Sequence, residues 1–266
     1  METLDELILA LWNDYTNINK QAGAIFQLLT DRGEKVFNDH IAFRTYNHPK
    51  VGIDKIAQHF EKFGYETKGQ YNFEVKKLNA KHYEHPDDDK PLVFISELKM
   101  EEFSDELKAT VNGLIDQVPE EKVKAPDFPV AGRLWNPTTY KVYTQLKKES
   151  EYAAWVSVFG FRANHFTVQF NTLTSFKSFK GFNQFLIDNG FNMNTSGGLI
   201  KGSRKELLEQ SSTMAHPVAI EFSDKKETIP ACYYEFAQRY PDAQGKLFMG
   251  FVPQSADKIF ESTDNK

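Results

Sequence analysis

The sequence has little cysteine, no long apolar run and no excess of basic residues. Its 266 residues include one cysteine, Cys232, so an internal disulfide is excluded. No run approaches the roughly 20 apolar residues of a membrane-spanning helix. The formal net charge is -5, with Lys and Arg scattered, which argues against a nucleic-acid partner. The first residues, METLDELILALWNDY, are acidic and amphipathic, unlike a signal peptide. We therefore expect a soluble, cytoplasmic protein without a membrane partner.

Aromatic and apolar residues are abundant instead. Apolar residues make up 40% of the chain, which includes 23 Phe and 11 Tyr, enough to build a large packed core. The patterning predicts one compact catalytic domain spanning the whole chain. We divide it into N-terminal helices over residues 1–36, a first module over 37–122, a connector over 123–160 and a second module over 161–266.

The order of predicted elements recurs along the chain. His40, in the strand-like run FNDHIAFRTYN, precedes Gly64 by 24 positions, and His165, in RANHFTVQFNT, precedes Gly190 by 25, each pair joined by one amphipathic helix. Strand candidates then follow each helix; in the second series they are GGLIKGS, HPVAIEFS and CYYEFAQRY. The pattern alone leaves two interpretations open, a duplicated βαβββ module in an α+β fold or a coincidence.

Side chains alternate between the two faces of a strand, which groups several polar residues. His40 and Arg44 share one face of the first strand. His165 shares a face of the later strand with Thr167 and Gln169. If the two modules pack about a pseudo-twofold axis, both histidines project into one concavity.

A carboxylate completes this candidate site. Glu235 lies in the middle of CYYEFAQRY, an apolar strand where an unpaired charge would be costly. Two histidines and one carboxylate form the facial triad that suits non-haem Fe(II), and Zn(II) binds the same residue types. The competing interpretation is a set of buried histidines hydrogen-bonded to a structural carboxylate.

Two arginines follow these residues at the same spacing. Arg44 lies four residues after His40, about 13 Å along a strand, so it could bind the far carboxylate of a metal-chelating dicarboxylic acid. The alternative is an ion pair with a structural acid such as Asp39 or Glu97. Arg239 lies four residues after Glu235 and is either a second anion contact or a surface charge.

The ordered motifs NDHIAFRT, ANHFTV and YYEFAQR resemble the DUF1338 family of Fe(II)-dependent 2-oxoadipate dioxygenase/decarboxylases, also called 2-hydroxyglutarate synthases. The resemblance implies a fold similar to the vicinal oxygen chelate superfamily, with a curved mixed sheet around the metal. Its metal ligands would be His40, His165 and Glu235, and its substrate-binding arginine would be Arg44. It also implies a role in lysine catabolism.

The function expected from this resemblance is conversion of 2-oxoadipate and dioxygen to 2-hydroxyglutarate and CO2. In a crystal the site could hold Zn, Ni, Mn or Co in place of iron. Longer family members carry additional segments, some of which help close the substrate pocket, and we expect this compact chain to lack them. The alternatives are a glyoxalase-like Zn or Ni lyase or isomerase, with Glu97 or Glu221 as a second metal carboxylate, and a non-catalytic module that binds a small acid.

Overall fold

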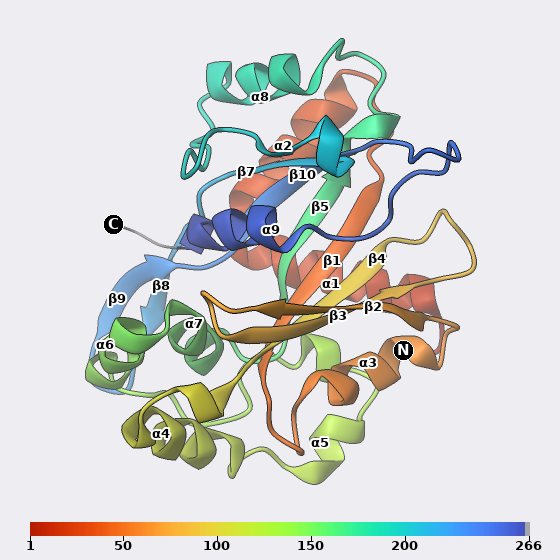
Figure 1. Ribbon diagram of the computed structural model, residues 1–266. Helices are drawn as coiled ribbons and strands as arrows, with labels where there is room; N and C mark the ends of the chain where they lie inside the picture. Colours follow the sequence, from red (N-terminus) through yellow and green to blue (C-terminus); the bar gives the residue numbers. More distant parts are fainter. Residues whose placement is uncertain (264–266) are drawn as a thin grey trace.

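One mixed eight-stranded sheet organises the protein (Figure 1). The computed structural model describes residues 1–263, in which the strands follow the order β2-β3-β4-β1-β5-β10-β7-β6. The strands are β1 Asn38–Tyr46, β2 Glu66–Phe73, β3 Leu78–Glu84, β4 Leu92–Leu98, β5 Ala163–Gln169, β6 Lys201–Ser203, β7 Leu208–Ser212 and β10 Tyr233–Arg239. A separate hairpin consists of β8 Pro217–Glu221 and β9 Lys226–Pro230.

Helices precede, connect and follow these strands. They are α1 Leu4–Ile18, α2 Lys20–Asp31, α3 Ile53–Glu61, α4 Asp105–Ile115, α5 Glu120–Lys124, α6 Tyr140–Glu149, α7 Glu151–Phe159, α8 Phe179–Asp188 and α9 Pro253–Phe260. Short 3-10 turns occupy η1 Met100–Glu102, η2 Phe128–Val130, η3 Phe170–Thr172, η4 Arg204–Glu206 and η5 Glu261–Thr263. Within residues 1–263, none of these helices is long and apolar enough to cross a bilayer.

The sheet order confirms the predicted duplication. In the first half, β1, α3, β2, β3 and β4 form a βαβββ unit whose strands lie in the order β2-β3-β4-β1. In the second half, β5, α8, β6, β7 and β10 repeat it in mirrored order, β5-β10-β7-β6. The two halves meet where β1 pairs antiparallel with β5. This is the α+β, vicinal oxygen chelate-like arrangement expected from the sequence.

One predicted strand of the second half lies outside the main sheet. HPVAIEFS does form a strand, β8, but it pairs only with β9 in the separate hairpin. The sheet position is taken by β7, which joins β6 to β10. Its sequence, LEQSS, is polar, and three consecutive residues, Gln210, Ser211 and Ser212, are buried. Apolar alternation therefore gave no signal for β7.

Helices cover the convex face of the sheet with aromatic contacts. Trp12 of α1 packs edge-on against Phe166 of β5, with ring centroids 5.2 Å apart. On the other half, Phe60 of α3 packs against Phe43 of β1 at 5.5 Å. These partners are the strand residues whose side chains point away from the histidines. The apolar face of each strand is thus used for the core, which leaves the opposite face for polar groups.

The concave face is covered by α7 and α9. Helix α9 contacts β6 and β7 near one edge of the sheet and β2 at the other, so the sheet curls around it. In Figure 1 this helix, in dark blue, lies in front of the central strands, whereas α1 and α2, in red, lie behind them. Helix α7 packs on β1, where the hydroxyl of Tyr152 accepts a hydrogen bond from the backbone of Thr45 at 3.0 Å, and the same hydroxyl donates to the carbonyl oxygen of Ser96 in β4 at 2.7 Å.

Candidate metal centre and active site

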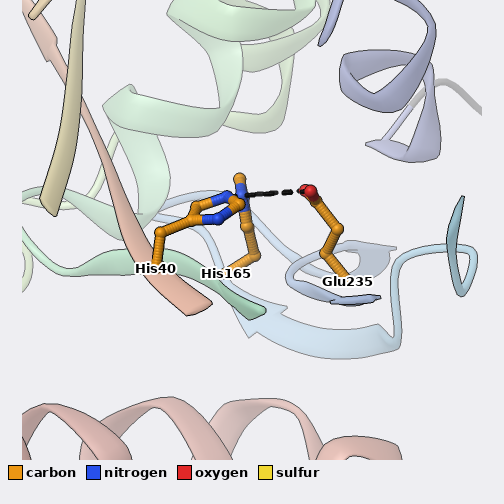
Figure 2. Close-up of side chains that lie close together, drawn as sticks. All are labelled: His40, His165 and Glu235. Carbon is orange, nitrogen blue, oxygen red and sulfur yellow. Dashed lines mark ion pairs between the residues drawn. The ribbon is translucent and has the colours of Figure 1, made fainter. Parts of the chain in front are cut away.

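His40, His165 and Glu235 converge on the concave face from three adjacent strands. One candidate ligand atom from each residue lies within 4.8 Å of the other two, and all three side chains are buried. His165 Nε2 lies 3.1 Å from one oxygen of Glu235, and His40 Nε2 lies 3.7 Å from the other. Figure 2 shows the three side chains pointing toward one another. The predicted grouping of these residues is therefore present in the structure.

Strand register explains this convergence. β5 is the central strand of the three, and Thr167 lies opposite His40 of β1 on one side and Glu235 of β10 on the other. Residues opposite each other in neighbouring strands point to the same face of the sheet. His165 lies two residues before Thr167, so it shares that face. Three chain segments far apart in sequence thus present their polar groups on one side.

Each histidine is preceded by a residue that holds its second ring nitrogen. Asp39 Oδ1 lies 2.7 Å from His40 Nδ1, and Asn164 Oδ1 lies 3.0 Å from His165 Nδ1. Consecutive strand residues normally point to opposite faces, but the β1–β5 register shifts at Asp39 on one strand and at Asn164 on the other. These β-bulges bring each supporting side chain beside its histidine. With Nδ1 protonated, the lone pair of each Nε2 is directed toward the cluster.

The surroundings of His165 and Glu235 shift both pKa values in the direction that suits a cation. Burial lowers the pKa of His165, which favours the neutral imidazole. Burial alone would raise the pKa of Glu235, but His40 and His165 outweigh that effect and hold it below its usual value. Gln210 of β7 also donates a hydrogen bond to Glu235 Oε1 at 2.6 Å. Neutral imidazoles and an ionised carboxylate are the forms that bind a divalent metal.

A small enclosed cavity adjoins the three residues. Its volume is about 20 Å³, and its lining consists of His40, Phe94, His165, Gln210, Glu235, Phe251, Ala256, Ile259 and Phe260. The last three belong to α9, and Phe251 lies just before that helix. A cavity of this size holds about one water molecule. The C-terminal segment therefore covers the cluster and leaves no room for a six-carbon acid.

Comparison with known proteins identifies the family. The family model described as 2-oxoadipate dioxygenase/decarboxylase matches residues 4–126 and again residues 127–249. A protein of Oryza sativa with the same description is 36% identical over 276 residues, which cover 94% of this chain and 76% of the rice protein. The chain belongs to the 2-oxoadipate dioxygenase/decarboxylase family. The named relatives are oxidoreductase-type enzymes, as the ordered motifs predict.

Solved structures extend this result. The crystal structure of rice hydroxyglutarate synthase in complex with 2-oxoadipate matches with a TM-score of 0.93 and 34% identity, over 98% of this chain and 91% of that one. A structure from Shewanella frigidimarina with a provisional hydrolase description matches with a TM-score of 0.91 and 49% identity, over 95% and 99% of the two chains. The chain is thus nearly coextensive with family members of similar size.

Arg44 of this 2-oxoadipate dioxygenase/decarboxylase family member lies in an aromatic enclosure next to the cavity. Its guanidinium lies 5.0 Å from the ring centre of Tyr152 and 5.9 Å from that of Phe260. Nη1 donates to Glu151 at 2.9 Å and Nη2 to Thr263 at 3.2 Å, whereas Nε has no hydrogen-bond partner within the described chain. Arg44 therefore has an acid partner, which is neither of the two considered from the sequence.

Thr167 and Gln169 differ in their distance from the cluster. Thr167 is fully buried, and its hydroxyl lies 3.0 Å from His40 Nε2. Gln169 is partly exposed at the end of β5 and is not among the residues that line the cavity. Glu97 accepts a hydrogen bond from the backbone of Ile53, and the exposed Glu221 pairs with Lys226 on the hairpin, so neither joins the cluster.

Sequence reasoning missed several residues around the cluster. Arg239 is neither a surface charge nor free for a substrate, because it is 1% exposed and ion-paired with Asp39 at 2.7 Å. Gln210 was missed because it lies in the unpredicted strand β7. Phe251 covers the His40 ring edge-on, with centroids 4.9 Å apart. A polar residue before each histidine, in NDH and ANH, was the one available signal for the two supporting side chains.

Proposed function

We propose that this protein is a non-haem Fe(II)-dependent dioxygenase/decarboxylase that converts 2-oxoadipate and dioxygen to 2-hydroxyglutarate and CO2. The observation that carries the proposal is the buried cluster of His40, His165 and Glu235 in a chain of this family. The relatives described as acting on 2-oxoadipate, and the rice complex that contains it, support the choice of substrate.

The residues of the cluster fit a metal of this kind. Two imidazole nitrogens and one carboxylate, all from strands of one sheet, are the donor set of a facial triad, which leaves coordination positions open. The supporting contacts from Asp39 and Asn164 are of the type that orients metal-binding histidines. Bound Fe(II) would supply the redox chemistry with dioxygen that these side chains lack.

Other residues would bind and enclose the substrate. Arg44 would bind the carboxylate far from the 2-oxo group through its fork of donors, including the unpaired Nε, and so fix the position of the chain. Thr167 would contact a group bound beside His40. Gln169 remains a predicted substrate contact. Helix α9 would exclude water once the acid is bound.

Two other functions predict different chemistry. A glyoxalase-like lyase or isomerase with Zn or Ni is expected to use a second carboxylate ligand, and the cluster found among residues 1–263 contains one carboxylate, Glu235. A non-catalytic module that binds a small acid would need the pocket but no metal. Among residues 1–263, Glu235 has no lysine or arginine as an ion-pair partner, and its close burial beside two histidines favours a metal-dependent role.

One experiment separates these functions. Metal-free protein is loaded anaerobically with Fe(II), mixed with 2-oxoadipate and oxygen, and followed for oxygen uptake and CO2 release. The proposal requires equal, iron-dependent amounts of both, with 2-hydroxyglutarate as the product. Turnover of hemithioacetals with Zn or Ni, without oxygen uptake, would favour the lyase. Tight binding of 2-oxoadipate by metal-free protein without turnover would favour the binding module.

Two variants test the assignment of residues. His40→Ala should abolish Fe(II) binding, because it removes one of three ligands. Arg44→Ala should raise the KM for 2-oxoadipate while leaving the Fe(II) affinity unchanged. Loss of iron from Arg44→Ala as well would contradict this division of roles.

A further inference from the structure

A buried ion pair lies directly behind the first histidine of the cluster. Arg239 binds Asp39 through two parallel contacts, Nε to Oδ2 at 2.7 Å and Nη2 to Oδ1 at 2.9 Å. Both side chains are fully buried. A buried, bidentate arginine–carboxylate pair is costly to desolvate, so it is a weak contributor to stability in itself. Its position points to another role.

The pair is linked to His40 on its Nδ1 side. The same Asp39 oxygen that accepts from Arg239 Nη2 also lies 2.7 Å from His40 Nδ1. Two parallel contacts with the guanidinium are the geometry of an arginine–carboxylate ion pair, so Asp39 faces His40 as an anion. An anionic acceptor fixes the ring rotation and keeps the proton on Nδ1. His165 differs, since its Nδ1 faces the neutral amide of Asn164.

Arg239 also fixes the segment that covers the His40 ring. Its remaining nitrogen, Nη1, donates to the carbonyl oxygens of Phe248 and Gly250 at 2.8 and 2.9 Å. The next residue, Phe251, packs edge-on against His40. The Arg239 guanidinium thus acts on the His40 ring in two ways. Through Asp39 it fixes the contact at Nδ1, and through the Phe248 and Gly250 carbonyl groups it fixes the segment that carries Phe251.

We propose that Asp39 and Arg239 are positioning residues that hold His40 ready to bind the metal. The inference rests on the proposed metal site. It assigns to these two residues the task of holding the His40 ring in its metal-binding orientation before the metal arrives. Outer contacts of this kind typically change metal affinity by about 10- to 100-fold. A purely structural ion pair would instead affect unfolding without changing the affinity or spectrum of the folded, metal-loaded protein.

The test compares metal binding by the full-length protein and four variants. Asp39→Asn keeps the shape and an acceptor oxygen but removes the charge. Arg239→Lys keeps the charge but loses the fork. The double variant Asp39→Asn/Arg239→Met removes both charges together, so that no unpaired ion stays buried if a single variant fails to fold. Arg204→Met is the matched control, since Arg204 is exposed and stacks on Tyr240 away from the cluster.

Dissociation constants for Fe(II) are measured anaerobically, together with the visible absorption spectrum of the Co(II)-loaded protein. We expect the double variant to bind Fe(II) at least tenfold more weakly and to show an altered Co(II) spectrum. Arg239→Lys should lie between wild type and the double variant, and Arg204→Met should match wild type. Wild-type affinity and spectrum in a folded double variant would overturn the inference. If the wild-type protein itself binds neither Fe(II) nor Co(II), the proposed function is wrong. That result differs from one in which only the positioning role of Asp39 and Arg239 is wrong, because the wild type then still binds metal.

Discussion

The hydroxyl of Thr167 lies 3.0 Å from Nε2 of His40, the ring nitrogen that lies 3.7 Å from Glu235. Nδ1 of the same ring carries the proton that it donates to Asp39, so Nε2 is unprotonated and accepts the hydrogen bond from Thr167 through its lone pair. A metal would need that lone pair. Thr167 and a metal therefore compete for one atom across the β1–β5 strand pair.

Replacing Thr167 by the isosteric valine tests this competition. Thr167→Val should lower the free energy of unfolding of the metal-free protein by about 1 kcal/mol, the usual net value of one hydrogen bond. Because the metal no longer displaces a hydrogen bond, its affinity should rise by up to about fivefold, which corresponds to the same free energy. Urea unfolding and competition with a chromophoric chelator measure the two effects. A weaker affinity in the variant would show that Thr167 assists the bound state instead.

Helix α9 must move for substrate to enter, because the cavity of about 20 Å³ beneath it cannot hold a six-carbon acid. Hydrogen exchange of the amides in Pro253–Phe260 should therefore be faster than in β5 in the free protein. Adding Fe(II) and 2-oxoadipate without oxygen should slow exchange in α9 by about tenfold or more, since ligand binding favours the closed state. Exchange in α9 that is as slow as in β5, and unaffected by the ligands, would place the entrance elsewhere.

Lys201 should make stability depend on pH in the alkaline range. It is 3% exposed, and burial lowers its pKa to about 8, although Glu235 and Glu261 oppose the shift. Its folded pKa lies below the unfolded value of about 10.4, so folding is penalised while the amine is charged, and the penalty disappears as the pH rises from 8 to 10.5. The penalty reaches about 3 kcal/mol at most, at 1.4 kcal/mol for each pH unit.

Lys201→Met removes this titration. The stability of the metal-free variant, relative to wild type, should therefore be greatest near pH 7 and decline toward pH 10.5. The lost hydrogen bond from Nζ to the carbonyl oxygen of Asn194 adds a constant difference of about 1 kcal/mol in the opposite direction. Urea unfolding at several pH values gives the comparison. A difference that does not change with pH would show that the amine titrates normally in the folded protein.

Tyr15 ties the N-terminal helix to the strand that carries Glu235. Its hydroxyl donates to the carbonyl oxygen of Tyr233 at 2.5 Å and accepts from Asn19 at 2.9 Å. Tyr15→Phe leaves two buried polar groups without this partner and should lower the free energy of unfolding by about 1–3 kcal/mol. Tyr140→Phe is the control, since within residues 1–263 the Tyr140 hydroxyl has no hydrogen bond. Metal affinity should not change, and a loss of affinity would mean that α1 also shapes the cluster.

Residue periodicity predicted much of the fold and the faces of the polar residues. The alternation of β1 and β5 grouped His40 with Arg44 and His165 with Thr167, and the repeat predicted two similar modules. Periodicity could not predict the register between neighbouring strands, which is what places Glu235 beside the two histidines. The register follows from which strands pair, and only the resemblance of the ordered motifs to a known family indicated that pairing.

Other features had no local pattern to reveal them. β7 escaped detection because three of its four buried residues, Gln210, Ser211 and Ser212, are polar, so the usual sign of burial is missing. The partner of Arg44 proved to be Glu151, which lies 107 positions away on a helix in the connector. The role of Arg239 depends on a bulge at Asp39, and a bulge reverses the face that simple alternation assigns.

Each histidine is supported by the residue just before it in the chain, Asp39 for His40 and Asn164 for His165. The two bulges allow this, because they bring consecutive side chains to the same face of the sheet. Each half of the protein therefore carries a histidine and its supporting oxygen within a single dipeptide, although Arg239 of the second half holds Asp39 of the first. A chain built from two such halves needs one further residue, Glu235, to complete the set. Because both bulges lie in the β1–β5 pairing and Arg239 crosses from the second half to Asp39, a substitution in either half can change how His40 is held.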